Sequence, residues 1–326
     1  MAGYDVVGIG NALVDVVAHT DEGFLAAQGL AKGAMTLVEA DAADRLYAAM
    51  PPGIECSGGS CGNTMAGLAS LGGRGAYIGV VHDDQLGRVF RHDLTAIGID
   101  FATPAAAGGP PTGRCLVLVT ADAERTMATF LGAAATLAPG DIDPLAIGAA
   151  KVVYLEGYLF DREAAKQAFV KAAELAHAAG RKVALTLSDG FCVERHRAAF
   201  RHLVEHHVDI LFANETEITA LYQTPDFDAA ARAVAGHCEI ACLTRSAKGS
   251  VVLANGDRHV VPAASVARVV DTTGAGDLYA AGFLYGYTQG LPLPEAGRIG
   301  ALAAAEVIGH YGARPAADLA ALLAQG

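Results

Sequence analysis

The segment DTTGAGD, which ends at Asp277, combines the residue types that phosphoryl transfer requires. The alanine-rich and aromatic run after it predicts a buried helix, so Gly274, Ala275 and Gly276 fall at a helix N-terminus, where free N–H groups and the helix dipole bind anions. Glycine lets a phosphoryl oxygen approach these amides closely, and Asp277 could then accept the proton of an attacking hydroxyl. The alternative is a glycine-rich helix start at which Asp271 or Asp277 is merely a cap.

Apolar runs rich in β-branched residues alternate with alanine-rich stretches at helical spacing along most of the chain. This alternation is typical of βαβ units around a mostly parallel sheet, and it would bring catalytic loops to the carboxyl ends of the strands. Strands are expected at 5–9, 76–81, 151–155, 182–187, 209–212 and 240–244, and helices at 63–71, 85–97, 162–179, 215–222, 275–289 and 293–308.

One stretch interrupts the alternation. After the cluster GGPPTG come two strand-like runs separated by the turn-like ADAE. Together with two earlier runs they predict a small antiparallel sheet that stands off the main one as a lid. Since no linker or internal repeat divides the chain, residues 1–326 are predicted to form a single domain, with a β lid built from about 12–18, 34–38 and 112–130.

Composition limits the class of partner. The 326 residues include 23 Lys and Arg against 35 Asp and Glu, and the resulting formal charge of −12 disfavours binding to nucleic acid or to an anionic membrane. A small-molecule partner is expected. The chain has no bilayer-spanning apolar run, no basic leader at its start and no CxxC pair among its six cysteines, which favours a reduced, cytoplasmic protein. The sequence leaves both a monomer and a homodimer open.

The chain resembles the ribokinase-like, or phosphofructokinase-B (PfkB), family of carbohydrate and nucleoside kinases, whose C-terminal signature is DTxGAGD. The resemblance covers nearly the whole chain and is carried also by GIGNALVD, GGSCGNTMAGLASLG, NETE and LTRSAKGS, all in the family's order. It implies a ribokinase-like αβα sandwich with a β lid. It also implies an enzyme that uses ATP and Mg²⁺, and in some members K⁺, with Asp277 as its catalytic base.

The resemblance assigns four residues to acceptor binding. Family positions matching Asp15, Gly59 and Asn63 hold acceptor hydroxyls, and a carboxylate in so apolar a run needs a partner. The alternatives are an Asx turn at Asp15 and serine caps on the helix that follows GGS. Arg125 resembles the arginine of the GxRxM segment in adenosine-kinase-like members. It could swing onto the transferring phosphate or be an exposed strand charge.

The expected nucleotide-binding residues come from two motifs. NETE places Asn214 and Glu217 one helical turn apart, and the resemblance implies that they organise Mg²⁺, through waters, and the ATP phosphates. A capping box is the alternative. Thr244 and Gly249 match the nucleotide-binding turn of the family, which commonly reads TxGxxG, and Ser246 replaces its inner glycine.

Asp271 and Thr273 match positions that help to hold a monovalent cation in several family members, although they could equally only shape the anion-binding loop. Other features are discounted. The histidines of RHLVEHH are expected on a solvated helix face, and GIGNAL lacks the third glycine of a dinucleotide site. No GxxxxGK[ST] occurs, so ATP would not bind on a P-loop.

Three strings, AERTMATFLGA, LEGYLF and GAGDLYAAGFLYG, are similar to bacterial adenosine-kinase-like members. Phe130, Leu131 or Phe160 could supply an apolar wall for a purine. We therefore predict transfer of the γ-phosphate of ATP to the 5′-hydroxyl of adenosine or a related nucleoside. A sugar kinase for ribose, fructose or a sugar acid is the first alternative. A non-catalytic nucleotide- or metabolite-binding relative is the second, and the intact Asp277 argues against it.

Overall fold

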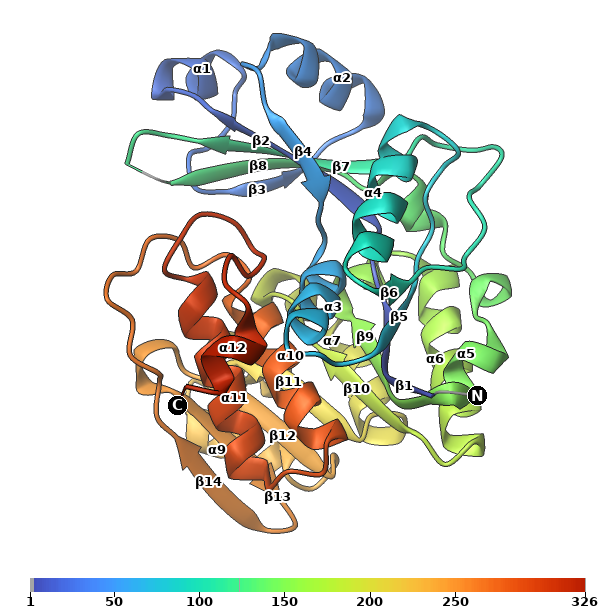
Figure 1. Cartoon of the computed structure of the whole chain (residues 1–326), viewed down its shortest axis with the longest axis vertical. Coiled ribbons are helices and arrows are strands. Elements are labelled where there is room, and N and C mark those ends of the chain that lie inside the picture. Colours follow the sequence, from blue (N-terminus) through green and yellow to red (C-terminus); the bar gives the residue numbers. More distant parts are fainter. Residues whose placement is uncertain (1–2, 123, 326) are drawn as a thin grey trace.

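The computed structural model describes residues 3–122 and 124–325, so that Ala123, in the turn of the expected lid, lies outside the described residues. The larger of two sheets has nine strands, in the order β14-β13-β12-β11-β10-β9-β1-β5-β6 (Figure 1). Their bounds are β1 (Tyr4–Ile9), β5 (Gly75–Ile78), β6 (Ile99–Asp100), β9 (Ala150–Glu156), β10 (Lys182–Thr186), β11 (Ile210–Asn214), β12 (Ile240–Thr244), β13 (Ser250–Ala254) and β14 (Asp257–Val261).

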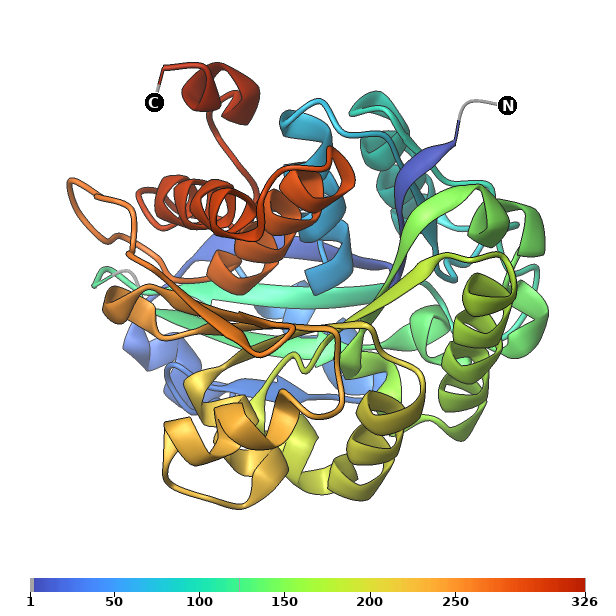
Figure 2. The same cartoon turned by 90° about the horizontal axis from the view of Figure 1, so that it is seen from below.

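All pairs from β6 to β12 are parallel, and only β13 and β14 are antiparallel additions at one edge. Helices cover both faces, as Figure 2 shows, and the parallel strands are accordingly mostly apolar. On one face lie α3 (Ser60–Ser70), α4 (Gln85–Ala96), α10 (Ala275–Thr288) and α11 (Leu293–Val307). On the other lie α5 (Pro144–Ala149), α6 (Glu163–Ala178), α7 (Gly190–His206), α8 (Glu215–Tyr222) and α9 (Phe227–Val234).

The expected fold class is confirmed, and each strand and helix expected from the sequence is present with ends shifted by a few residues. Further elements are the helix α12 (Leu319–Leu323) and four short 3₁₀ turns at Gly132–Thr136, Pro139–Asp141, Gly157–Asp161 and Ser246–Lys248. No helix in the described part of the chain is long and apolar enough to cross a membrane. None of the six cysteines, all of which lie in the described part of the chain, forms a disulfide.

The smaller sheet forms the lid. Its strands, in the order β3-β8-β7-β2-β4, are β2 (Leu13–His19), β3 (Met35–Leu37), β4 (Ile54–Ser57), β7 (Gly113–Val119) and β8 (Arg125–Phe130). The expectation of an antiparallel sheet was wrong in part: β2–β7 and β3–β8 pair in parallel, and only β7–β8 and β2–β4 are antiparallel. Strand β4 was not expected, because its short, half-exposed run becomes a strand only by pairing with β2.

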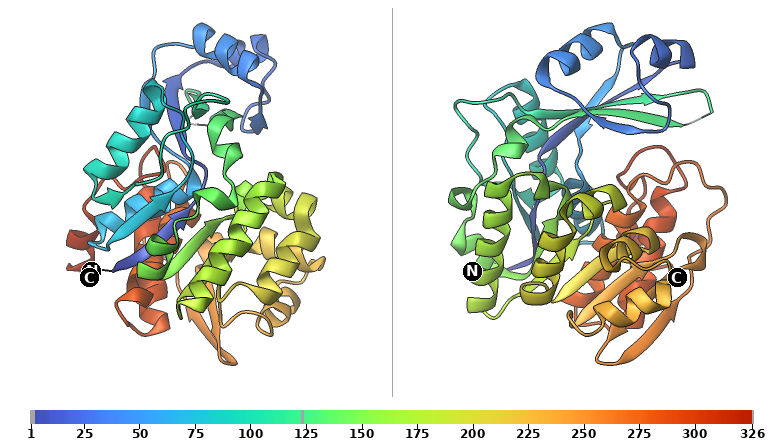
Figure 3. Two further views of the ribbon diagram at one scale, coloured as in Figure 1. Left: turned by 90° about the vertical axis from the view of Figure 1, so that its right-hand side faces the viewer. Right: turned by 180° about the vertical axis from the view of Figure 1, so that it is seen from behind.

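The two faces of the lid differ. The helices α1 (Glu22–Ala27) and α2 (Ala40–Ala49) cover the outer face, where they pack on Leu116, Leu118 and Ala128 (Figure 3). The opposite, inner face carries the residues that alternate with these. We define it by Asp15, Val17, Met35, Leu37, Cys115, Val117, Arg125, Met127 and Thr129.

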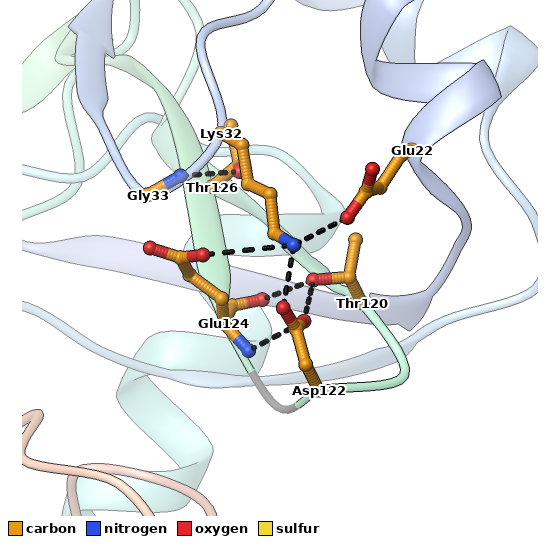
Figure 4. Close-up of polar contacts among 7 residues, drawn as sticks. All are labelled: Glu22, Lys32, Gly33, Thr120, Asp122, Glu124 and Thr126. Atoms are coloured by element: carbon orange, nitrogen blue, oxygen red, sulfur yellow. Dashed lines mark hydrogen bonds and ion pairs between the residues drawn. The ribbon is translucent and has the colours of Figure 1, made fainter.

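Lys32 joins the segment before β3 to the β7–β8 hairpin (Figure 4). Its Nζ lies 2.5 Å from both Glu22 Oε1 and Asp122 Oδ2, and 3.7 Å from Glu124 Oε2. These hydrogen-bonded pairs raise the pKa of Lys32 and lower that of Asp122. Because the acidic partners are exposed and screened by salt, the cluster positions the hairpin and adds little stability.

Candidate active site

The start of α10 is built as the sequence predicts. Gly274 is the N-cap, with φ 79°, and a Cβ there would lie 2.7 Å from the carbonyl oxygen of Ala313, so only glycine fits. At Gly276 the position of a Cβ has no other atom within 4 Å, and this residue is exposed. The first helical turn is therefore open on the side of Gly276, where a phosphoryl oxygen could approach its amides.

The carboxylate of Asp277 is held without being neutralised. Ser60 Oγ donates to its Oδ1 at 2.6 Å and Asn63 Nδ2 donates to its Oδ2 at 3.0 Å. No described Lys, Arg or His forms an ion pair with it. Burial raises the pKa of Asp277, and the two hydrogen bonds oppose that rise. A fixed carboxylate with a raised pKa and no cationic partner is suited to accept a proton.

Ser60 and Asn63 lie one turn apart on α3, and both point at Asp277. Asn63 was expected to bind the acceptor, and the structure places its amide on the carboxylate of Asp277. Ser60 was regarded only as a possible cap, but the N-cap of α3 is Gly59, with no side-chain cap bond. The i, i+3 spacing of the two polar residues in GGSCGN was the signal that could have identified Ser60.

Asp15 lies in the same site. It belongs to β2, where it pairs with Cys56 and Cys115, so the Asx-turn alternative is excluded. A Cβ at Gly58 would lie 2.2 Å from Asp15 Oδ1, so the carboxylate packs directly against the glycine pair. The pKa of Asp15 is raised to about 6, mainly by burial and also by Asp277, against the opposing effect of Arg314 and Arg125.

Gly59 brings two backbones together. It has φ 81°, and a Cβ there would lie 2.4 Å from the carbonyl oxygen of Asn11, which follows β1. Glycine is therefore required whether or not a substrate binds. The side of Gly59 that meets Asn11 is occupied by the chain itself.

Glu156 is a site residue that the sequence analysis missed. This buried carboxylate ends β9 and accepts hydrogen bonds from Asn11 Nδ2 at 2.7 Å and from the Cys61 backbone N–H at 2.8 Å. Burial raises its pKa to about 7, against those hydrogen bonds. It joins the end of β1 to the first turn of α3. The argument that singled out Asp15, a carboxylate in an apolar strand, applied equally to LEGYLF.

Arg125 connects the smaller sheet to the loop before α10. Its Nη2 lies 2.8 Å from Asp271 Oδ2, and the two side chains are only 9% and 6% exposed, so Arg125 is no exposed strand charge. Asp271 also accepts from the N–H and Oγ1 of Thr273, at 3.0 and 2.7 Å, and from the Gly312 N–H at 3.1 Å. The lid is thus closed onto the loop through a buried ion pair.

The nucleotide-side residues end neighbouring strands. Asn214 and Thr244 are register partners at the carboxyl ends of β11 and β12. The capping box is fully formed: Asn214 Oδ1 accepts from the Glu217 N–H at 2.8 Å, and the Glu217 carboxylate accepts from the N–H and Nδ2 of Asn214. The pKa of Glu217 is raised to about 7, mainly by burial and also by Asp189 and Asp277, against the hydrogen bond from the Asn214 N–H. A buried carboxylate among like charges fits a hydrated divalent cation, which would offset that cost.

The turn after β12 has a left-handed residue at both ends. Ser246 has φ 51° and Gly249 has φ 80°. A Cβ at Gly249 would lie 2.1 Å from the carbonyl oxygen of Val261, so this position requires glycine. Ser246 adopts the conformation that glycine accommodates most easily, at a cost of about 1 kcal/mol, so the backbone has the form that an inner glycine would give.

Two suggested purine walls are wrong. Phe160 stacks on Phe200, with ring centroids 4.2 Å apart, inside the core beneath the large sheet. Phe130 alternates with the inner-face residues of β8 and so belongs to the outer face, with Ala128. The apolar surface on the inner face comes instead from Val17, Val117 and Met127.

We expect kcat/KM for the acceptor to rise with pH and level off above about pH 7. In their expected roles, Asp15 binds hydroxyls and Asp277 accepts a proton, so both must be ionised, and both have raised pKa values. Below about pH 6 the rate should fall by roughly tenfold per unit or more, because each protonation alone stops the reaction. A profile of kcat/KM from pH 5 to 9 tests this, and a flat profile down to pH 5 would contradict it.

The loss of kcat/KM at low pH should not be caused by acid unfolding of the protein. The folded-state pKa values of Asp15, Glu156 and Glu217, about 6, 7 and 7, exceed the ordinary carboxyl values. Their contribution to stability is therefore fully present below about pH 4 and is lost as the pH rises through 6 to 7. Tm measured over the same range separates the two effects.

A mostly parallel α/β sandwich with a lid, in which a held carboxylate lies beside an open helix start, defines a phosphotransferase that acts on alcohol groups. The pfkB family of carbohydrate kinases matches residues 54–319, and the chain belongs to that family. Two solved structures cover almost the entire chain. Adenosine kinase from Sinorhizobium meliloti is 52% identical, with a TM-score of 0.93 over 99% of each chain.

A probable sugar kinase from Rhizobium etli CFN 42 is 47% identical, with a TM-score of 0.93 over 100% of this chain and 99% of that one. By sequence, 5-dehydro-2-deoxygluconokinase from Geobacillus thermodenitrificans is 29% identical over 265 residues, which are 78% of this chain and 79% of the relative. Nucleoside and sugar kinases are both among the relatives. The activity common to them is phosphoryl transfer to a hydroxyl group.

Proposed function

We propose that this protein is a cytoplasmic, ATP- and Mg²⁺-dependent kinase that phosphorylates the 5′-hydroxyl of adenosine or a related nucleoside. The observation that carries the proposal is the placement of Asp277. Its carboxylate is held by Ser60 and Asn63 beside the open N-terminal turn of α10. A base and an anion-binding turn at one place are what in-line transfer to a hydroxyl needs.

In this proposal the acceptor binds against Asp15, Gly59 and Asn63 beneath the closed lid, which excludes water. Asp277 takes the proton of the attacking hydroxyl, and the amides of Gly274, Ala275 and Gly276 stabilise the charge on the transferring group. The guanidinium of Arg125, already at Asp271, is close enough to the catalytic loop to turn onto that group. The lid therefore positions the reactants.

The nucleotide would lie along the strand ends marked by Asn214 and Thr244 and the turn at Gly249. Glu217, with Asn214, would hold Mg²⁺ through waters. When bound, the ion would neutralise part of the phosphate charge. Asp271 and Thr273 remain candidates for a K⁺ site, which would replace some of the hydrogen bonds that Asp271 accepts now.

The inner face of the lid favours a nucleoside. Besides Val17, Val117 and Met127 it carries Met35 and Leu37, which are 41% and 47% exposed on β3. A flat purine would cover the exposed Met35 and Leu37, whereas a sugar ring would leave them in contact with water. The adenosine kinase named above is also the more similar of the two structural relatives. The names of the other two relatives favour a sugar kinase, which is the second candidate.

A panel of acceptors tests the choice. With ATP and Mg²⁺, and ADP release as the readout, we expect kcat/KM for adenosine to exceed that for ribose, fructose or a sugar acid by about 10²-fold or more. Removal of Mg²⁺ by a chelator should abolish turnover, and added Mg²⁺ should restore it. Faster turnover of a sugar than of any nucleoside would reverse the order of the two candidates.

A further inference from the structure

The segment between α11 and α12 delivers an arginine, Arg314, into the acceptor site. This segment lies at the end of α11 nearest the lid (Figure 1). Its backbone is held on both sides of Arg314. The Gly312 N–H donates to Asp271 at 3.1 Å, and the N–H groups of Ala316 and Ala317 donate to Glu306 Oε1 at 3.0 and 2.8 Å. The position of Arg314 is therefore fixed by its own chain segment.

The side chain of Arg314 reaches α3 and approaches Asp15. Its Nη2 lies 3.5 Å from the position that a Cβ on Gly62 would occupy, in the first turn of α3. Arg314 is the cation that most lowers the pKa of Asp15, and Asp15 is the anion that most opposes the lowering of the Arg314 pKa by burial. Yet the two side chains make no direct ion pair in the described structure.

Two nitrogens of Arg314 are buried without partners. Neither Nε nor Nη2 finds a hydrogen-bond partner among the described residues. Leaving buried charged donors unpaired is more costly than leaving a neutral group unpaired, so packing alone does not account for this arginine. These two donors point to a ligand oxygen.

Other buried polar atoms without partners belong to residues that adjoin or contact Gly10, Gly58 and Gly59. They are Asn11 Oδ1, in the residue whose backbone carbonyl meets Gly59; Ser57 Oγ, in the residue before Gly58; and Tyr77 Oη, which lies 3.2 Å from the position of a Cβ on Gly10. A hydroxyl group can donate one hydrogen bond and accept others. A ligand with hydroxyls could thus give a proton to Asp15 while its oxygen accepts from Arg314.

We propose that Arg314 binds the acceptor directly, by donating to a hydroxyl oxygen whose proton is directed at Asp15, and that the two side chains together select an acceptor with a vicinal diol. This inference rests on the proposed function, in which the diol is that of the ribose ring. It adds an arginine from outside every motif of the sequence to the acceptor site.

Arg314→Met and Arg314→Lys test the inference with adenosine, 2′-deoxyadenosine and 3′-deoxyadenosine as acceptors. Arg314→Met should raise the KM for adenosine by about 10- to 10²-fold, with a smaller change in kcat and none in the KM for ATP. For the deoxynucleoside that lacks the contacted hydroxyl, the variant and the wild type should have similar KM values. Arg314→Lys should restore part of the loss.

Equal losses with adenosine and with both deoxynucleosides would overturn the inference, since Arg314 would then shape the site without touching the acceptor. A rise in the KM for ATP equal to that for adenosine would also overturn it. Protection of the nucleotide-free protein by adenosine against thermal unfolding gives a second readout, and Arg314→Met should weaken it.

Arg114→Met is the matched control. Arg114 is also a largely buried arginine with an unpartnered Nε, but it lies on β7 and pairs with Asp44. Its replacement should leave the KM for adenosine unchanged. If the wild type phosphorylates only a sugar, the nucleoside proposal fails by itself. The same variants are then compared on that sugar and its deoxy analogues. Equal losses with the sugar and with each deoxy analogue would refute the role of Arg314 independently.

Discussion

Asp277→Asn is expected to lower kcat by about 10²- to 10⁴-fold while the fold and acceptor binding are retained. The amide has the shape of the carboxylate and can still accept from Ser60 Oγ, but it cannot take a proton from the attacking hydroxyl. Because burial raises the pKa of Asp277, removing the charge also removes a desolvation cost, so Tm should stay the same or rise. ADP release gives kcat, and the adenosine-induced shift of Tm reports binding.

Ser60→Ala is the comparison for that variant. It removes the 2.6 Å hydrogen bond to Asp277 and leaves the base in place, so we expect a loss of about tenfold. It should also move the acidic limb of the pH profile to higher pH, since that hydrogen bond lowers the pKa of Asp277. If Asp277→Asn turns over as fast as Ser60→Ala, Asp277 is not the base.

The parts of the site that lie within one short segment could be predicted from the sequence. Gly274, Gly276 and Asp277 are a loop and the first turn of one helix, so their relation is set by local geometry. The placement of NETE near the end of β12 could also be expected from the sequence, because the carboxyl ends of parallel strands meet at one edge of a sheet. The capping box and the site role at Asn214 and Glu217 were both foreseen as alternatives, and the capping box is formed.

Contacts between distant segments could not be predicted. Ser60, Glu156 and Arg314 acquire their surroundings only when α3, β9 and the segment after α11 meet around Asp15 and Asp277. No local pattern fixes those meetings. The mixed parallel and antiparallel pairing of the lid strands could not be predicted for the same reason, since β2 and β3 pair with strands that are distant in the sequence.

The β13–β14 hairpin was also missed, although its signal in the sequence is local and strong. Asn255 and Gly256, with φ 51° and 86°, join the two strands in a two-residue turn. An Asn-Gly pair between apolar runs is the best short-range evidence for such a hairpin. The hairpin extends the large sheet beyond β12, the strand that ends at the proposed nucleotide site.

Gly276→Ala is expected to reduce kcat/KM by about 10²- to 10³-fold without loss of stability. The added methyl group would enter the open space at the start of α10, which is where a phosphoryl oxygen must approach the amides. Nothing in the described protein collides with it, so the helix should gain about 0.5–1 kcal/mol from the change. Assays of ADP release and Tm on the same preparation measure both effects.

Gly148→Ala controls for the helix effect. Gly148 lies within α5, also has open space at its Cβ position, and belongs to no part of the site. It should show the same small gain in Tm with unchanged activity. Gly274→Ala marks the opposite case, since its methyl group would meet Ala313 and destabilise the loop itself. If Gly276→Ala is as active as Gly148→Ala, no phosphoryl group approaches this helix start, and Asp277 loses the anion-binding partner on which its role depends.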